Sequence, residues 1–228
     1  MRLWSVQRAQ VLDKDYAEQR IQLEKIKNDQ LQTELKFLKS QYHPHFLFNA
    51  LNTVYFQIDE SNKAPRRTLE MISELLRYQL YGGNQKVSIL QEIDYLKTYI
   101  ALRKLRMSER LRLRVEFPPE LNELNIYPLL FLPLVENAFK YVGGDYQLDI
   151  IMKWENNRIS LFIRNSIPEL SAEDEALRKS VDERQRKGIG LVNLRRRLSL
   201  LYPNKHRLET RKEETEFVAE LMIEIEDI

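Results

Sequence analysis

The first part of the chain follows the periodicity of helices. Residues 5–40 contain no Gly or Pro, and apolar side chains then recur every three or four residues. One row consists of Leu31, Leu35, Leu38 and Tyr42, and a second consists of Leu47, Leu51, Val54 and Ile58. Two apolar rows on one helix favour packing in a bundle rather than in a two-stranded coil. Heptads are poor before residue 21, so we expect a linker helix over residues 1–30.

A second helix is predicted after a polar connection at residues 59–65. Pro65 suits a first helical turn, and Gly82 with Gly83 would end the helix. Its apolar positions are Leu69, Ile72, Leu76 and Leu80. Residues 31–87 therefore predict a helical hairpin, which would pair with a second copy to form a dimeric four-helix bundle.

Residues 88–228 alternate between the two periodicities. Ser88 and Gln91 form a potential capping box for the first helix of this region. Helices are predicted over residues 89–107, 128–141 and 189–202. Strands are predicted over residues 111–117, 148–154, 159–163, 206–212 and 217–225, the last four as two hairpins. The sequence thus predicts an α+β fold, with a helical hairpin before a mixed α/β domain.

Composition narrows the possible functions. The 36 Lys and Arg nearly balance the 34 Asp and Glu, so the net charge of +2 does not favour a polyanion-binding surface, and we expect no direct nucleic-acid binding. The absence of Cys excludes disulfides, thiolate zinc sites and cysteine catalysis. The longest apolar run, residues 127–135, is well short of the roughly 20 residues that span a bilayer. We therefore expect a cytoplasmic chain, which could be a piece of a longer protein.

The first candidate for chemistry is His45. Gln41 lies one helical turn before it and Asn49 one turn after it, on the same face. Amides at these positions could fix the orientation and the tautomer of the imidazole. Pro44 removes a backbone donor and should bend the helix. The alternative interpretation, a half-buried histidine in a bundle seam, fits the same spacing.

The second candidate lies on the helix predicted over residues 128–141. Glu136, Asn137, Lys140 and Tyr141 are polar groups on an otherwise apolar helix. An amide oxygen for hydrated Mg²⁺ and an ammonium group for a phosphate would suit a nucleotide. Ordinary surface residues of an amphipathic helix are the alternative.

The third candidate is a pair of glycines, Gly188 and Gly190, directly before the helix over residues 189–202. Such glycines let the backbone approach an anion at a helix N-terminus. An ordinary turn would also use them, but the chain has only six glycines. The arginines at 195–197 suggest a solvated face, although any of them could reach a phosphate.

Together these motifs resemble the cytoplasmic part of LytS-like sensor histidine kinases over residues 36–228. Gln41 and residues 44–49 are similar to the family's Gln-x-x-Pro-His-Phe-Leu-Phe-Asn pattern. Residues 136–140 resemble the N-box, and residues 188–198 resemble the G2 box. The resemblance implies a dimerisation and phosphoacceptor hairpin at 31–87. It also implies a Bergerat-type α/β sandwich that binds ATP at 88–228.

The resemblance also implies roles for single residues. His45 would accept the γ-phosphoryl group of ATP, and Asn137 would hold Mg²⁺. Lys140, Tyr141, Gly188, Gly190 and Leu191 would line the nucleotide site, and residues 166–187 would form its lid. The phosphoryl group would pass to an aspartate in the receiver domain of a response regulator, often of the LytTR type. Such proteins usually carry a membrane sensor, so the chain resembles the cytoplasmic portion of a bacterial inner-membrane receptor.

Three positions depart from the related patterns. Asn165 stands where the family has the aspartate of Asp-x-Gly-x-Gly, and residues 163–167 contain no glycine. Phe46, not an acid, follows His45, which leaves Glu136 as a candidate base. Pro133 replaces the glutamate of gyrase-type ATPases and argues against simple ATP hydrolysis. A histidine kinase is the preferred interpretation, and a catalytically weak pseudokinase acting as a dimeric scaffold is the alternative.

Overall fold

The computed structural model describes residues 44–81, 85–119, 124–168 and 189–225. The chain divides into two compact units, Met1–Asp59 and Glu60–Ile228. Several predictions fall outside the described residues. They are the linker helix at 1–30, the positions of Gln41 and Gly188, the helix stop at Gly82 and Gly83, and nearly all of the lid.

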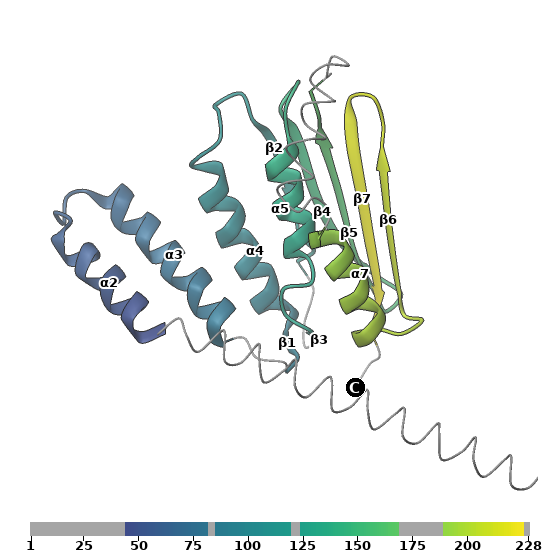
Figure 1. Cartoon of the computed structure of the whole chain (residues 1–228), viewed down its shortest axis with the longest axis horizontal. Helices are drawn as coiled ribbons and strands as arrows, with labels where there is room; N and C mark the ends of the chain where they lie inside the picture. The colour runs from purple at the N-terminus through teal and green to yellow at the C-terminus, as the bar shows by residue number, and fades with distance from the viewer. Residues whose placement is uncertain (1–43, 82–84, 120–123, 169–188, 226–228) are drawn as a thin grey trace, which may run out of the picture. The chain divides into compact units, whose positions relative to one another are not determined.

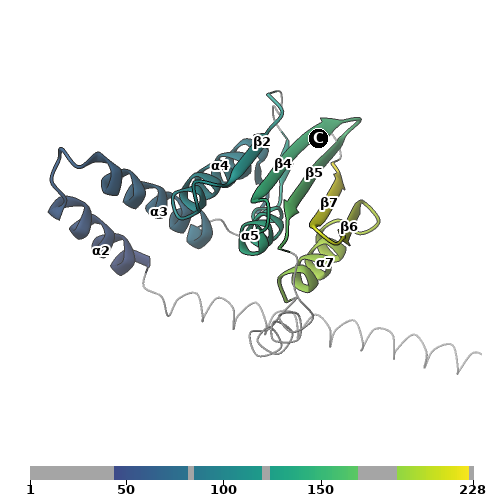
Figure 2. The ribbon, with the colours of Figure 1, turned by 90° about the horizontal axis from the view of Figure 1, so that it is seen from above.

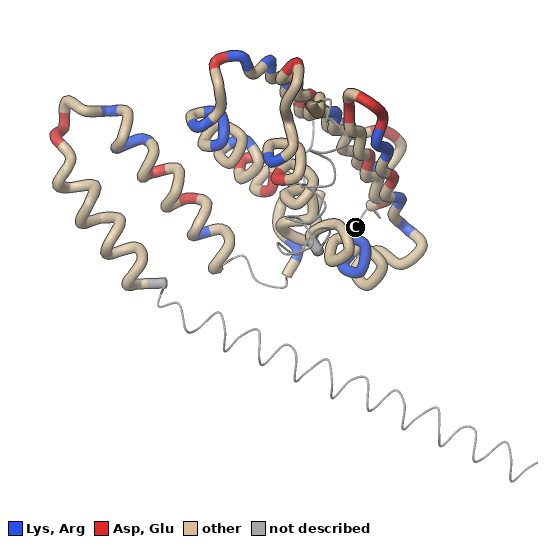
Figure 3. Tube along the Cα trace, turned by 45° about the horizontal axis from the view of Figure 1, so that its top comes forward, with Lys and Arg blue, Asp and Glu red and all other residues tan. Residues whose placement is uncertain are grey.

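The described part of the first unit is helix α2, Pro44–Gln57. Pro44 is the first described residue of this helix, so the bend predicted there involves residues outside the described ranges. The helix carries no charged residue, as Figure 3 shows, and Phe46, Val54 and Phe56 are exposed on it. An apolar helix with exposed aromatic side chains needs another surface to cover it. The predicted four-helix bundle would supply that surface and stays a prediction.

The second unit begins with helix α3, Lys63–Tyr81, which lies beside α4, Ile89–Lys104 (Figure 1). Leu75 of α3 is part of the buried core, and Tyr78 stacks on Tyr95 of α4 at 4.6 Å between ring centroids. Helix α3 therefore belongs to the same compact unit as the sheet. The hairpin predicted over residues 31–87 stays a prediction, because periodicity does not reveal which partner covers an apolar face.

Helix α4 begins with the predicted capping box. The Ser88 hydroxyl accepts a hydrogen bond from the Leu90 amide, and the Gln91 side chain accepts one from the Ser88 amide, both at 3.3 Å. Strand β1 (Val87–Ser88) directly precedes this helix and pairs with another very short strand, β3 (Asn125–Ile126), which follows β2 in the sequence. The sequence does not predict these two strands, because two residues are too few for a periodic pattern.

The main sheet has the strand order β2-β4-β5-β7-β6. Its strands are β2 (Arg112–Glu116), β4 (Gln147–Glu155), β5 (Arg158–Ser166), β6 (His206–Lys212) and β7 (Glu216–Glu224). Strand β2 is parallel to β4 and the other pairs are antiparallel, so the predicted α+β fold with a mixed sheet is confirmed. Asn156 and Asn157 join β4 to β5 with φ of 51° and 57°, as a two-residue hairpin turn requires.

Helices cover one face of this sheet (Figures 1 and 2). They are α4, α5 (Leu132–Tyr141) and α7 (Ile189–Leu201). Alternate side chains of the strands point toward them, among them Ile150 of β4 and Leu161 of β5, which are fully buried. None of the described helices is both long enough and apolar enough to cross a membrane.

Helix α5 begins later than predicted. The apolar pattern predicts a start at Pro128, whereas the helix begins at Leu132. Leu129 has a φ of 58°, in the left-handed region, which a right-handed helix cannot contain. The apolar pattern extends over the preceding turn because those residues are also buried, among them Leu130 and Phe131.

Candidate functional site

Helix α2 places His45 beside Asn49. The Asn49 amide nitrogen lies 3.2 Å from Nδ1 of the imidazole, and the Thr53 hydroxyl donates to the Asn49 carbonyl at 2.8 Å. Both His45 and Asn49 are exposed. The spacing of four residues thus brings the two side chains together, as the helical period predicts. The contact engages Nδ1, and the tautomer of the imidazole decides which of the two groups donates.

Helix α5 presents its polar side chains away from the core. Glu136 and Lys140 are exposed one turn apart, and Asn137 and Tyr141 are half-buried one turn apart. The opposite side of the helix is buried against the sheet through Leu134, Val135, Ala138 and Phe139. The Lys140 ammonium lies 4.9 Å from the centre of the Tyr141 ring. The four residues predicted on this helix therefore lie along one polar flank.

Partial burial changes the acidity of Glu136. The surrounding residues shield the carboxylate from water and raise its pKa, although part of the side chain is exposed. The positive charge of Arg103 on α4 acts in the opposite direction. The Arg103 guanidinium lies 5.7 Å from the centre of the Phe139 ring, which places it on the α4 side of α5. A carboxylate with a raised pKa is better suited to accept a proton near neutral pH.

Asn165 lies near the end of β5, on the face that the helices cover. It continues the row of Ile159, Leu161 and Ile163 and is wholly buried. Its amide nitrogen donates to the Ser166 carbonyl at 3.2 Å, but its oxygen Oδ1 has no partner among the described residues. A buried acceptor without a donor costs about 1–3 kcal/mol. The exocyclic amine of adenine is a donor that would satisfy this oxygen.

The end of β5 is bonded to the loop that follows α5. The Gly143 amide donates to the Ser166 carbonyl at 3.0 Å, and the Ser166 hydroxyl donates to the Gly143 carbonyl at 2.6 Å. A Cβ atom on Gly143 would lie 2.8 Å from Cδ of Pro168, so only glycine fits. The sequence pattern does not predict this contact, although two adjacent glycines in a chain with six are a usable signal. The contact brings the C-terminal end of α5 next to Asn165.

Gly190 lies at the start of α7 and is exposed. No atom lies within 4 Å of the position that a Cβ on it would occupy, so the described chain does not itself require glycine there. Leu191 packs against the core. The arginines that follow are not simply a solvated face. Arg195 donates to the Leu208 carbonyl at 2.9 Å, and Arg197 donates to the Pro128 carbonyl at 2.8 Å.

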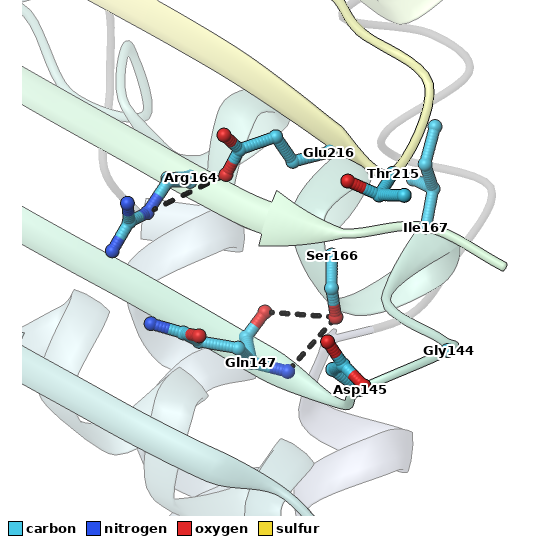
Figure 4. Close-up of a pocket in the computed structure, with 8 residues that line it drawn as sticks. All are labelled: Gly144, Asp145, Gln147, Arg164, Ser166, Ile167, Thr215 and Glu216. Carbon is cyan, nitrogen blue, oxygen red and sulfur yellow. Dashed lines mark hydrogen bonds and ion pairs between the residues drawn. The ribbon is translucent and has the colours of Figure 1, made fainter.

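A separate pocket lies on the opposite face of the sheet (Figure 4). Arg164 and Ser166 line it, and they alternate with Asn165 along β5, so they project to the other side. Arg164 is already paired, with its Nη2 2.6 Å from an Asp149 oxygen and its Nε 3.8 Å from a Glu216 oxygen. The remaining lining residues are Gly144, Asp145, Gln147, Ile167 and Thr215. This pocket is distinct from the site predicted around Asn137 and Asn165.

Comparisons with known proteins agree with the motifs. Residues 33–111 match the histidine kinase family model. The chain is 29% identical over 180 residues to the sensor protein kinase HptS of Staphylococcus aureus. The aligned region covers 77% of this chain and 35% of HptS. The chain thus spans about a third of the length of the curated relatives that it matches.

Two solved structures of histidine kinases match the chain, both with TM-scores below 0.5. The match to the Acinetobacter baumannii histidine kinase AdeS covers 82% of this chain and 98% of the AdeS chain, with 13% identity and a TM-score of 0.42. The match to the structure of full-length ShkA in complex with AMPPNP covers 80% of this chain and 44% of the ShkA chain, with 13% identity and a TM-score of 0.42. The family match and the curated relatives support a protein-histidine kinase.

Proposed function

We propose that the chain is the kinase core of a LytS-like sensor histidine kinase. It binds ATP with Mg²⁺, transfers the γ-phosphoryl group to His45 and passes it to an aspartate of a response regulator. The observation that carries this proposal is the buried Oδ1 of Asn165, which has no hydrogen-bond partner among the described residues. It lies at the position where the family pattern contacts adenine, and the adenine amine would donate to it. The family match over residues 33–111 supports the phosphoacceptor part.

Three elements would hold the nucleotide. Asn165 at the end of β5 would accept a hydrogen bond from adenine. The exposed backbone at Gly190 would let the triphosphate approach the N-terminus of α7, where amide groups favour an anion. On α5, Lys140 would contribute positive charge, and the Asn137 oxygen suits Mg²⁺, which prefers oxygen ligands. When bound, Mg²⁺ neutralises charge on the triphosphate and orients its oxygens.

The His45 imidazole would react through Nε2. A bond forms from this nitrogen to the γ-phosphorus while the bond from that phosphorus to the bridging oxygen breaks, and ADP leaves with the electron pair. The Asn49 amide orients the ring through Nδ1. Because the two orientations of an amide group are nearly isosteric, the same contact accommodates a proton on Nδ1. The phosphorylated ring then loses its Nδ1 proton, and Glu136 is available to accept it. Catalysis is mainly positioning and charge stabilisation.

The proposal includes a homodimer held by helical hairpins that form a four-helix bundle. The uncharged surface of α2, with its exposed Phe46 and Phe56, supports such an interface. The receiver domain of a response regulator, of the LytTR type, would be the phosphoryl acceptor. The sensor kinase relatives support a membrane-anchored sensor as the full-length protein.

The test is incubation of the chain with γ-labelled ATP and Mg²⁺. The label should enter the protein, survive alkali and be lost in acid, as a phosphoramidate is. His45→Gln should abolish this label, whereas His43→Gln should leave most of it. Labelling that persists in His45→Gln and disappears in His43→Gln would reverse the assignment of the acceptor.

One observation favours the second candidate function, a pseudokinase scaffold. Asn165 is completely buried, and Ser166 with Ile167 stand where a family member has flexible glycine. If the chain binds neither ATP nor GTP at millimolar concentration yet remains a dimer, the scaffold function replaces the kinase.

A further inference from the structure

One buried carboxylate lies outside the sites described above. Glu92 of α4 has no exposed surface. Its oxygen Oε2 accepts two hydrogen bonds, from the Tyr78 hydroxyl of α3 at 2.7 Å and from the Leu129 amide at 2.9 Å. Leu129 belongs to the turn that leads into α5. A single oxygen atom therefore joins α3, α4 and the turn before the helix that carries Asn137.

This turn is held in an unfavourable conformation. A residue other than glycine in the left-handed region, as Leu129 is, costs of the order of 1 kcal/mol or more and must be held by its surroundings. The amide of Leu129 is held by Glu92, while Arg197 of α7 donates to the carbonyls of Pro128 at 2.8 Å and of Leu129 at 3.4 Å. Charged side chains thus fix the peptide groups on both sides of Leu129.

The direction of α5 depends on this turn. The helix has no side-chain hydrogen bond at its N-cap, Phe131, so no local cap fixes its start. The amides of Leu134 and Val135 instead bond the Phe131 carbonyl, at 3.1 and 3.3 Å. Because a helix moves as a stiff rod, a shift of the turn at residues 128–131 would move Glu136 and Asn137.

Helix α3 reaches the carboxylate through the Tyr78 hydroxyl group. Tyr78 and Gln79 both contact Tyr95 of α4, the first by ring stacking and the second by a hydrogen bond of 2.6 Å to the Tyr95 hydroxyl. The Tyr95 hydroxyl therefore ties α3 to α4. The Tyr78 hydroxyl also ties α3 to α4, but it donates to Oε2 of Glu92, which also accepts from the Leu129 amide. Two phenol hydroxyls therefore link α3 to α4, and only the bond of Tyr78 involves a carboxylate that also bonds the turn before α5.

We propose that Glu92 is a positioning residue that couples helix α3 to the start of α5, and that α3 acts on it through the Tyr78 hydroxyl. A displacement of α3 would then reach the nucleotide-binding flank of α5 without passing through the sheet. Burial raises the pKa of Glu92, while Tyr78, the Leu129 and Phe131 amides and Arg197 favour its charged form. The coupling to Asn137 rests on the proposed function, whereas the coupling to α5 does not.

The test compares Tyr78→Phe with Tyr95→Phe in the 228-residue chain. Each variant removes one phenol oxygen between α3 and α4 and keeps the aromatic stack. Amide hydrogen exchange without nucleotide should become at least threefold faster at Leu129 and in the first turn of α5 for Tyr78→Phe. It should change less than twofold there for Tyr95→Phe. Calorimetry with Mg²⁺ and ATP should show an affinity about three- to tenfold weaker for Tyr78→Phe only, the usual effect of one lost hydrogen bond.

Glu92 itself provides the second comparison. Glu92→Gln keeps the size and one acceptor oxygen, so it should retain part of the exchange protection at Leu129, whereas Glu92→Leu should lose it. Equal exchange in the Tyr78 and Tyr95 variants would overturn the proposal, because both contacts would then only attach α3 to α4. If the wild-type chain binds no nucleotide, the proposed function fails, and the exchange measurements still decide the coupling.

Discussion

Polar atoms that are buried without a hydrogen bond gather around α5. Within the described residues they are Oε1 of Glu92, Nε of Arg103 and Oδ1 of Asn165. Glu92 holds the turn before the helix, Arg103 lies over the Phe139 ring, and Asn165 is next to the residue that bonds Gly143 after the helix. Groups of this kind cost stability, so they are retained for another reason. For Asn165 we propose a ligand, and for Glu92 a positioning role.

Asn165→Asp tests the ligand at the residue scale. A charged acceptor makes a stronger hydrogen bond to the adenine amine than an amide does, by roughly 1 kcal/mol. We expect ATP to bind up to about tenfold more tightly and GTP to gain less, because guanine presents a carbonyl at that position. Titrations of both proteins with ATP and GTP measure this. Asn137→Ala is the opposing variant and should weaken Mg²⁺-ATP binding. Equal gains for ATP and GTP would show that Asn165 does not contact the base.

Glu92→Gln tests the cost of the buried carboxylate. Burial raises the pKa of Glu92 above its ordinary value of 4.5, so the folded chain keeps this proton to a higher pH than the unfolded chain does. The free energy of unfolding therefore falls as the pH rises from about 4.5 through the raised pKa, and then levels off. Gln does not titrate, so the stability of the variant relative to the wild type should rise with pH over this window.

Urea unfolding of both proteins between about pH 5 and pH 8 measures this difference. Glu136, whose pKa is also raised, is present in both proteins, so its contribution cancels. A relative stability that falls with increasing pH would show that the hydrogen bonds from Tyr78 and Leu129 outweigh burial.

At the scale of elements, local patterns are sufficient for the five strands of the main sheet and for the His45 pair. Alternation predicted β4 and β5, and it also places Asn165 on the buried face. The four-residue period predicted the contact of His45 with Asn49. These local patterns do not predict contacts between residues that are distant in the sequence. The start of α5 depends on Glu92, 37 residues before Leu129 in the sequence.

A local signal for Glu92 did exist. A carboxylate in the apolar row that includes Ile89, Ile93 and Leu96 suggests a buried partner, but periodicity alone does not name it. The same limit applies to α3, whose apolar residues suit a bundle as well as they suit α4. The bond between Gly143 and Ser166 spans 23 residues and has only the glycine pair as its signal.

Gly190→Ala tests the N-terminus of α7. Open space around the Cβ position means that alanine fits, and alanine favours a helix by up to about 1 kcal/mol. We therefore expect a slightly more stable protein that binds Mg²⁺-ATP at least about tenfold more weakly, because the methyl group would obstruct the phosphates. Thermal unfolding and calorimetry measure the two effects. Ser199→Ala on the same helix is the control and should leave binding unchanged. A Gly190→Ala chain that binds ATP normally would remove α7 from the nucleotide site.

At the scale of the whole molecule, α2 determines the assembly that we propose. Sedimentation should give about twice the chain mass of 27.4 kDa. Phe56, 78% exposed, would lie in the bundle, so Phe56→Glu should shift the protein toward monomer. Leu200, 72% exposed on α7, is the matched control, and Leu200→Glu should stay dimeric. A wild-type chain that is monomeric at high micromolar concentration would contradict the dimer.

The most direct test of the proposed kinase is to identify the phosphorylated atom after incubation with ATP and Mg²⁺. Peptide mapping under alkaline conditions should place the phosphoryl group on the peptide that contains His45. Phosphorus NMR should assign it to Nε2, because the Asn49 amide engages Nδ1. Asn49→Ala should slow the labelling and yield a mixture of Nε2 and Nδ1 products. An acid-stable phosphate on a hydroxyl group, or no label on His45 in a chain that binds ATP, would contradict the account.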